Sequence, residues 1–207
     1  WPENWLEPEF RDDKTHLFAE LESSLLESDL GSEAVEAALH QYLTGLEEIA
    51  RLDIRAIYKE ERMSGDVLHV VARTTNAPHK YFYRTWSHRS WTPWAPVTAE
   101  IESDHVVLVV WRDRVHLFWV QFIPQAEASR GNIPSNRKTA DLTAGNIAGM
   151  KPKKMVDVLL YWSALLQGEW SDPVLAQPDP PLTKSVHDDF HARQVFIWAD
   201  VLSTGEV

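Results

Sequence analysis

The fold is decided by two stretches, residues 83–97 (YRTWSHRSWTPWAPV) and residues 161–174 (YWSALLQGEWSDPV). Each begins as an apolar strand, passes through a turn and continues through a Trp, a small hydroxyl residue and a Pro. Trp favours strands and large flat contacts, and Pro blunts the free edge of a sheet. A unit of this kind that occurs twice predicts a β architecture of similar hairpins or blades. Two copies also fit two unrelated hairpins that both use Trp as core.

The apolar residues around these stretches recur with the period of two that is typical of strands. We expect strands over residues 53–58, 67–74, 80–86, 105–111, 115–122, 156–162 and 194–201, with turns at 64–66 and 112–114. Residues 124–154 contain Pro, Gly and six basic side chains without a sustained period. This composition predicts a flexible loop inside the β region.

Before residue 53 the apolar spacing has the helical period. Thr15 is placed to cap a first helix, a turn follows at 28–31, and Ser32 is placed to cap a second helix. The pattern therefore predicts an α+β fold. A helical hairpin occupies residues 1–52, and an antiparallel β domain, either a sandwich or a partial propeller, occupies residues 53–207.

Composition limits the classes of partner. The chain has 207 residues and no Cys, so it forms neither disulfides nor zinc–thiolate sites. Residues 1–50 hold 13 acidic and 2 basic side chains, which accounts for the whole net charge of −11. Without a basic stripe, a nucleic-acid partner is not expected. The acidic quarter fits a solvated helical surface or a surface that meets another part of a larger assembly. From the first and last residues we expect a piece of a longer protein.

Catalytic patterns are weak. His187 and His191 have the spacing of a helical metal pair, but a glutamate base is missing and the context is a loop, so no metal or cofactor is expected. The acidic doublets 60–61 and 188–189 would point to opposite faces of a strand, so they do not form a glycosidase pair. A glycine-rich phosphate loop and a Gly-x-Ser-x-Gly elbow are also missing. We therefore assign no catalytic residue.

Two sets of residues remain as candidate sites. Trp86, Trp91 and Trp94 lie too close in sequence for all three to be buried easily, so they are candidate glycan contacts, with hairpin packing as the alternative. His105 and His116 fall within expected strands, as does His69. Histidine changes its charge between about pH 5 and 8, so His105 and His116 are candidate pH-responsive residues.

Longer strings carry a resemblance to a known family. They are residues 1–8 (WPENWLEP), 11–22 (RDDKTxxFxELE), 42–52 (YLxxLEEIAxL), 91–94 (WTPW), 101–105 (IESDH) and 114–119 (RVHLFW). Over nearly its whole length, the chain resembles the A subunit of the bacterial Tc (toxin complex) insecticidal toxins. The resemblance covers the end of their helical shell region and the neuraminidase-like β domain that follows.

The resemblance implies a large, secreted, pore-forming homopentamer whose shell opens after a pH change and to which B–C toxin components bind. Contact with the host membrane would be made by other parts of the full-length protein. True sialidases use an arginine triad, a tyrosine nucleophile with a glutamate, and Ser-x-Asp-x-Gly-x-x-Trp boxes, and no such box occurs in this chain. We therefore expect a non-catalytic structural and gating module. The alternatives are a β module that binds host glycans and, third, a sialidase-like hydrolase.

Overall fold

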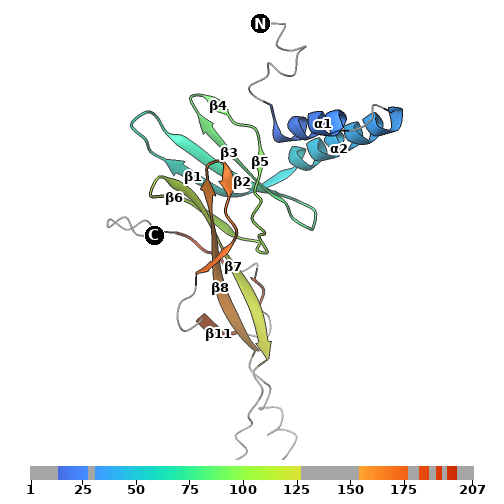
Figure 1. Cartoon of the computed structure of the whole chain (residues 1–207). Coiled ribbons are helices and arrows are strands. Elements are labelled where there is room, and N and C mark those ends of the chain that lie inside the picture. Colours follow the sequence, from blue (N-terminus) through green and yellow to red (C-terminus); the bar gives the residue numbers. More distant parts are fainter. Residues whose placement is uncertain are drawn as a thin grey trace, which may run out of the picture.

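The computed structural model describes residues 14–27, 31–126, 154–176, 182–186, 190–192 and 195–199. Two helices, α1 (His16–Glu27) and α2 (Ser32–Ala50), come before all the strands (Figure 1). The hydroxyl oxygen of Thr15 accepts a hydrogen bond from the Phe18 N–H at 3.2 Å, which confirms the predicted cap of α1. The predicted cap of α2 is wrong by one residue. Gly31 occupies the cap position, and Ser32 is already helical.

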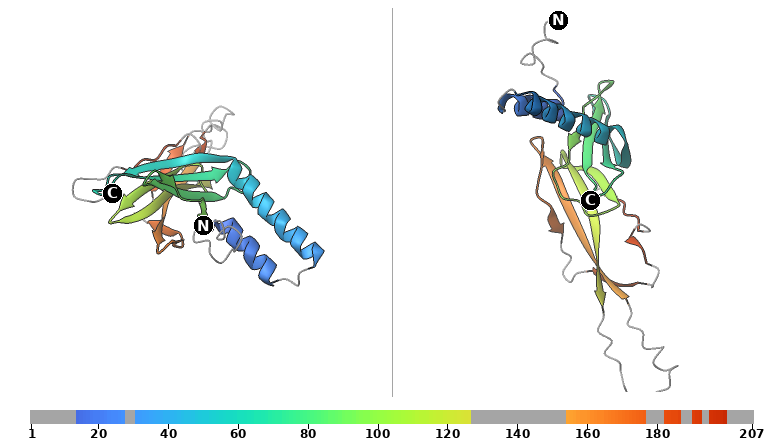
Figure 2. Two further views of the ribbon diagram at one scale, coloured as in Figure 1. Left: turned by 90° about the horizontal axis from the view of Figure 1, so that it is seen from above. Right: turned by 90° about the vertical axis from the view of Figure 1, so that its right-hand side faces the viewer.

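The helical hairpin projects away from the sheets (Figure 2, left). Gly45 lets the helices approach closely, because a Cβ at this position would lie 2.6 Å from Leu17 Cδ2. Among the described helical residues only Ala38 is buried, whereas Leu26 is 81% exposed and Leu43 is 62% exposed. The apolar stripe of the hairpin is thus only partly covered within this chain. Neither described helix combines the length and the apolar character that crossing a membrane requires.

The first sheet continues directly from α2. Its strands are β1 (Leu52–Glu60), β2 (Val67–Thr74), β3 (Tyr81–Ser87), β4 (Ser90–Trp91) and β5 (Ala95–Pro96). They are antiparallel in the order β1-β2-β3-β4, and β5 also pairs with β3. Lys80 binds Glu48 at 2.8 Å, which ties the β2–β3 turn to the end of α2.

The second sheet contains β6 (Val106–Trp111), β7 (Arg114–Ala126), β8 (Lys154–Leu166), β9 (Glu169–Trp170), β10 (Val174–Ala176) and β11 (Leu182–Val186). Its order is β10-β8-β7-β6, and β9 and β11 also pair with β8. β7 and β8 form a long ribbon that extends beyond the first sheet (Figure 1; Figure 2, right).

Several predicted boundaries are wrong in this second sheet. Residues 124–126 and 154, expected in a loop, belong to β7 and β8, and residues 127–153 lie outside the described part of the chain. Ladder pairing between β7 and β8 continues to these strand ends and overrides the Pro at 124. The described residues 195–199 of the expected strand 194–201 are not in a strand, and β11 was not expected.

The Trp-rich stretches form hairpins, as predicted, with Trp86 opposite Trp91 and Leu165 opposite Trp170. The two hairpins belong to different sheets. Residues from both sheets build one core, in which Val71 and Tyr83 of the first sheet pack with Leu117 and Trp119 of the second. Two helices followed by two packed antiparallel sheets confirm the α+β fold class.

Candidate functional site

A cleft of about 860 Å³ lies between β2, β3, the segment that leads into β6, and β7. The Arg73 guanidinium donates to an Asp104 carboxylate oxygen at 2.9 Å, which ties β2 to this connecting segment. The Tyr81 hydroxyl donates to the Ser103 carbonyl oxygen at 2.5 Å. Both interactions hold the wall of the cleft to the connection between the two sheets.

The pKa shifts of Tyr81 and Arg73 favour a protonated hydroxyl and a charged guanidinium, which suits a structural role for both. Burial raises the pKa of the Tyr81 hydroxyl, and the positive charge of Arg73 offsets this only in part. Burial by itself would lower the pKa of Arg73, but hydrogen bonds to Asp104 and Tyr81 keep it above its ordinary value. A tyrosine that acts as a nucleophile needs a lowered pKa or an adjacent base. The raised pKa of Tyr81 is the opposite of what a nucleophilic tyrosine requires.

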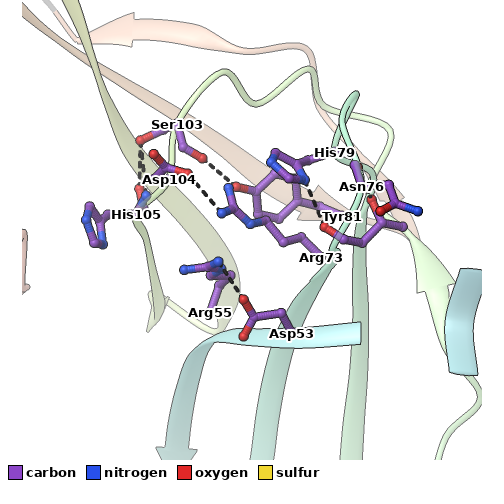
Figure 3. Close-up of polar contacts among 10 residues, drawn as sticks. Asp53, Arg55, Arg73, Asn76, His79, Tyr81, Ser103, Asp104 and His105 are labelled. Carbon is purple, nitrogen blue, oxygen red and sulfur yellow. Dashed lines mark hydrogen bonds and ion pairs between the residues drawn. The ribbon is translucent and has the colours of Figure 1, made fainter. Parts of the chain in front are cut away.

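The arginines near this cleft are already neutralised. Arg73 pairs with Asp104 at 2.9 Å, and Arg55 of β1 pairs with Asp53 at 2.5 Å (Figure 3). Within the described residues, these guanidinium groups each bind a carboxylate of the chain itself and do not converge on the open space. The arrangement can fasten strands to one another, but it does not resemble the arginine triad of a sialidase.

A second network lies at the other end of the first sheet. His69 of β2 is only 2% exposed. Its Nε2 lies 2.9 Å from Glu60 Oε2 of β1, and its Nδ1 lies 2.7 Å from the Tyr83 hydroxyl of β3. Arg62 donates to the other Glu60 oxygen at 2.7 Å. Four charged or titratable groups thus connect three adjacent strands; we call them the His69 network.

The partners fix the tautomer of His69. An ionised carboxylate only accepts hydrogen bonds, so Nε2 must carry the proton that is donated to Glu60. Nδ1 is then the acceptor for the Tyr83 O–H. A second proton on the ring would take the Nδ1 lone pair away from Tyr83, whose ring also packs edge-on against Trp170 at 5.5 Å. Protonation of His69 would therefore require the Tyr83 hydroxyl to turn from donor to acceptor.

The pKa shifts follow from this geometry. Burial lowers the pKa of His69, and the hydrogen bond to Glu60 compensates only partly. Burial would raise the pKa of Glu60, but hydrogen bonds from Arg62 and His69 outweigh it and leave the pKa below its ordinary value. Burial, together with the Glu60 charge, raises the pKa of Tyr83. Near neutral pH the network therefore holds a neutral histidine and an ionised glutamate.

The two histidines favoured by the sequence lie elsewhere. His116 of β7 is buried among Trp111, Phe118 and Trp162, and its Nδ1 donates to the Arg114 carbonyl oxygen at 3.0 Å. Burial lowers its pKa. His105 is half-buried, precedes β6 instead of lying within a strand, and packs 5.0 Å from the Phe196 ring. The structure does not bring His105 and His116 together.

The three candidate tryptophans do lie together. Trp86 of β3 pairs with Trp91 of β4, and the Arg84 guanidinium carbon lies over the rings of both Trp91 and Trp94, at 4.1 Å and 4.2 Å from their centroids. Trp91 is 44% exposed, and Trp86 and Trp94 are half-buried. We call these four residues the Trp–Arg stack.

Sequence patterns missed the His69 network and Arg84. Glu60 and His69 lie close because Glu60 pairs with Val67 across the β1–β2 turn, and that register depends on the turn length. A hairpin drawn from the turn at 64–66 would have brought residues 60 and 69 near each other. Arg84 and Trp86 lie two positions apart on one strand, so the alternation of side chains predicts that both lie on the same face of the sheet.

Known proteins share this arrangement of elements. A family model described as a Neuraminidase-like domain matches residues 52–197. Toxin subunit YenA2 of Yersinia entomophaga is 29% identical over 150 residues, which cover 64% of this chain and 11% of that protein. The relationship therefore concerns a small part of a much larger relative.

Two solved structures share the fold. Morganella morganii TcdA4 superposes with a TM-score of 0.63 at 19% identity, over 91% of this chain and 8% of that one. Yersinia pseudotuberculosis TcaA-TcaB superposes with a TM-score of 0.52 at 20% identity, over 88% of this chain and 9% of that one. The chain belongs to the neuraminidase-like domain family and is related to the A subunits of Tc toxins.

Proposed function

We propose that the chain is a non-catalytic structural and gating module of a secreted, pore-forming toxin-complex A subunit. Residues 1–52 form the end of its helical shell region, and residues 53–207 form the β domain that closes the shell and takes part in its pH-triggered opening. The partners are neighbouring copies of the full-length A subunit in a homopentamer and the B–C components. Other parts of that subunit contact the membrane.

One observation carries this proposal. In the His69 network, buried ionisable groups of β1, β2 and β3 bind one another across the strands. Protonation of His69 or Glu60 would change how β1, β2 and β3 hold together. A closure that responds to acid can use a link of this kind, because protonation changes the hydrogen bonds between the strands.

The gating role is tested in the intact A subunit. Glu60→Gln and His69→Gln should each shift the pH at which half of the particles have an opened shell, scored by cryo-electron microscopy over a pH series. Glu61→Gln is the matched control, because Glu61 is the neighbouring acid and its side chain is 79% exposed. An opening pH that is the same in both variants and the wild type would contradict the gating role.

The absence of catalysis is tested separately with a fluorogenic sialoside. Because Tyr81 and Arg73 are bound to groups of the chain, we expect no turnover by the 207-residue chain above that of a Tyr81→Phe variant. Turnover that Tyr81→Phe abolishes would establish a hydrolase instead.

A second candidate function is binding of host glycans by the Trp–Arg stack. The exposed face of Trp91, with half-buried Trp86 and Trp94 beside it, is the observation that supports it. Indole rings present a large flat apolar surface with a polar edge. Loss of glycan binding in Trp91→Ala, with the fold retained by circular dichroism, would support this function.

A further inference from the structure

Arg84 is held against two aromatic rings. Its guanidinium carbon lies 4.1 Å from the Trp91 ring centroid and 4.2 Å from that of Trp94. Contacts of this kind stabilise the cation while they remove water from the flat faces of the guanidinium. The hydrogen-bond donors of the group lie along its edges, where an anion can approach.

Arg84 differs from the other arginines of this sheet. Arg55, Arg62 and Arg73 each bind a carboxylate, on Asp53, Glu60 and Asp104 respectively. No carboxylate of the described residues lies within ion-pairing distance of Arg84, and its Nε is buried without a hydrogen-bond partner. Arg84 is half-buried and is held against two indoles without a carboxylate partner among the described residues.

The surroundings favour an anion. The adjacent β3–β4 turn presents His88 and Arg89, both exposed. Asp66, which lines the neighbouring pocket with Trp86, is paired with Lys59 at 2.9 Å. The β3–β4 hairpin lies at the outer end of the first sheet, away from the β7–β8 ribbon (Figure 1). An incoming carboxylate therefore meets the guanidinium groups of Arg84 and Arg89.

The size of the surface indicates a small ligand. A stable protein partner covers about 800 Å² on each side, whereas a whole Trp side chain offers about 150–250 Å² and those of the Trp–Arg stack are partly covered. Three partly covered indoles and one guanidinium match a ligand of a few sugar rings better than a folded protein. A forked guanidinium is matched to a planar carboxylate through two parallel hydrogen bonds.

We propose that the Trp–Arg stack binds sugars that carry a carboxylate, with Arg84 holding the carboxylate and Trp91 the sugar ring. This inference rests on the glycan-binding candidate function above and names the class of glycan. Because the cation is already ordered, little side-chain freedom is lost on binding. Arg84 then decides between acidic and neutral sugars.

The test is a titration of the 207-residue chain with 3′-sialyllactose and with lactose, followed by Trp fluorescence and by calorimetry. We expect sialyllactose to bind at least about tenfold more tightly than lactose, a ratio that corresponds to about 1.4 kcal/mol. Arg84→Gln should reduce this ratio to about one. Arg84→Lys, which keeps the charge and loses the fork, should lie between the two. Arg112→Gln is the matched control, because Arg112 is exposed and lies over a single indole, Trp111, at 4.4 Å.

Each outcome decides a different point. Equal affinities for the two sugars would overturn the role of Arg84 and leave the glycan-binding function standing. No binding of either sugar at millimolar concentration would overturn both. Tighter binding of poly-glutamate than of sialyllactose, lost in Arg84→Gln, would assign the stack to an acidic protein and reject the proposal. If Arg84→Gln fails to fold, the wild-type ratio and the Arg84→Lys variant still decide.

Discussion

At the residue scale, burial and two hydrogen bonds set the charge of His69. It is buried, donates to Glu60 and accepts from Tyr83, so both ring nitrogens have a defined partner. Burial lowers its pKa below the ordinary value near 6.5. Between that lowered pKa and the ordinary value, the unfolded chain binds more protons than the folded one, and folding stability therefore falls as the pH falls.

The first prediction concerns this pH dependence. The free energy of unfolding should decrease as the pH falls below about 6.5 and through the lowered pKa of His69, and again below the ordinary pKa of Glu60 near 4.5. Glu60→Gln should lower stability at pH 7.5 and flatten the part of the curve below 4.5. Urea unfolding at several pH values measures both effects. A Glu61→Gln curve that matches Glu60→Gln would contradict the assignment to Glu60.

The second prediction concerns the Arg73–Asp104 pair. Arg73→Met breaks the 2.9 Å ion pair with the partly buried Asp104 carboxylate, so we expect a loss of about 3 kcal/mol in unfolding free energy. The double variant Arg73→Met, Asp104→Asn also removes the Asp104 charge and should recover part of the loss. Urea unfolding of the two variants side by side checks this. Equal stabilities would show that the lost charge pairing is not the cause.

At the residue scale, the sequence indicated which side chains crowd together but not which ones pair. The closeness of Trp86, Trp91 and Trp94 correctly indicated that one of them stays exposed. The acid doublet at 60–61 predicts two side chains on opposite faces, and Glu60 turns inward to His69 while Glu61 stays exposed. The partner of Glu60 on β2 depends on the strand register, which neither composition nor local spacing sets.

At the scale of elements, the hairpins depend on two-residue turns. Positive φ values occur at His88 (49°) and Arg89 (63°), at Arg112 (50°) and Asp113 (59°), and at Gln167 (53°) and Gly168 (93°). Two consecutive residues with positive φ give the primed turn whose twist matches antiparallel strands. Most of these positions hold residues other than Gly, so the strands on either side impose a conformation that the turn residues do not favour.

The third prediction follows from the β8–β9 turn. Gln167→Asn creates the preferred Asn-Gly pair and should stabilise the chain by about 0.5 kcal/mol. Gly168→Ala should destabilise it by about 1 kcal/mol, and because nothing lies within 4 Å of the added Cβ, the cost comes from the backbone alone. Thermal unfolding measures both. A neutral Gly168→Ala would show that this turn adapts freely.

The fold class and most strands could be predicted from the sequence because alternation and hairpin turns are local signals. β2 agrees with the expected range 67–74 at both ends. The ends of β7 and β8 were not readable, because a Pro and a basic stretch suggested a loop while pairing between the two strands continued through residue 126. Long-range ladder pairing therefore decided the boundary that local composition predicted wrongly.

At the scale of the whole molecule, the helical hairpin and the two sheets differ in how many apolar side chains they bury. The sheets share one buried core, whereas the described helices bury only Ala38. The described ion pair between α2 and the sheet, Lys80–Glu48, is well exposed on the lysine side, and pairs of this kind contribute little. The helical hairpin should therefore open more readily than the β domain.

The last prediction is that unfolding of the isolated chain is not a single transition. Helical circular dichroism should be lost at lower urea than the Trp fluorescence of the sheets, and α1 and α2 should exchange amide hydrogens faster than β2, β3 and β7. The control is Ser163→Ala, which removes the hydrogen bond from the buried Ser163 hydroxyl to the Ser171 carbonyl at 2.8 Å and should lower only the second transition. Coincident transitions in the wild type would mean that the helices draw their stability from the sheets. Separate transitions would agree with a hairpin whose exposed Leu26 and Leu43 require covering by further parts of a larger subunit.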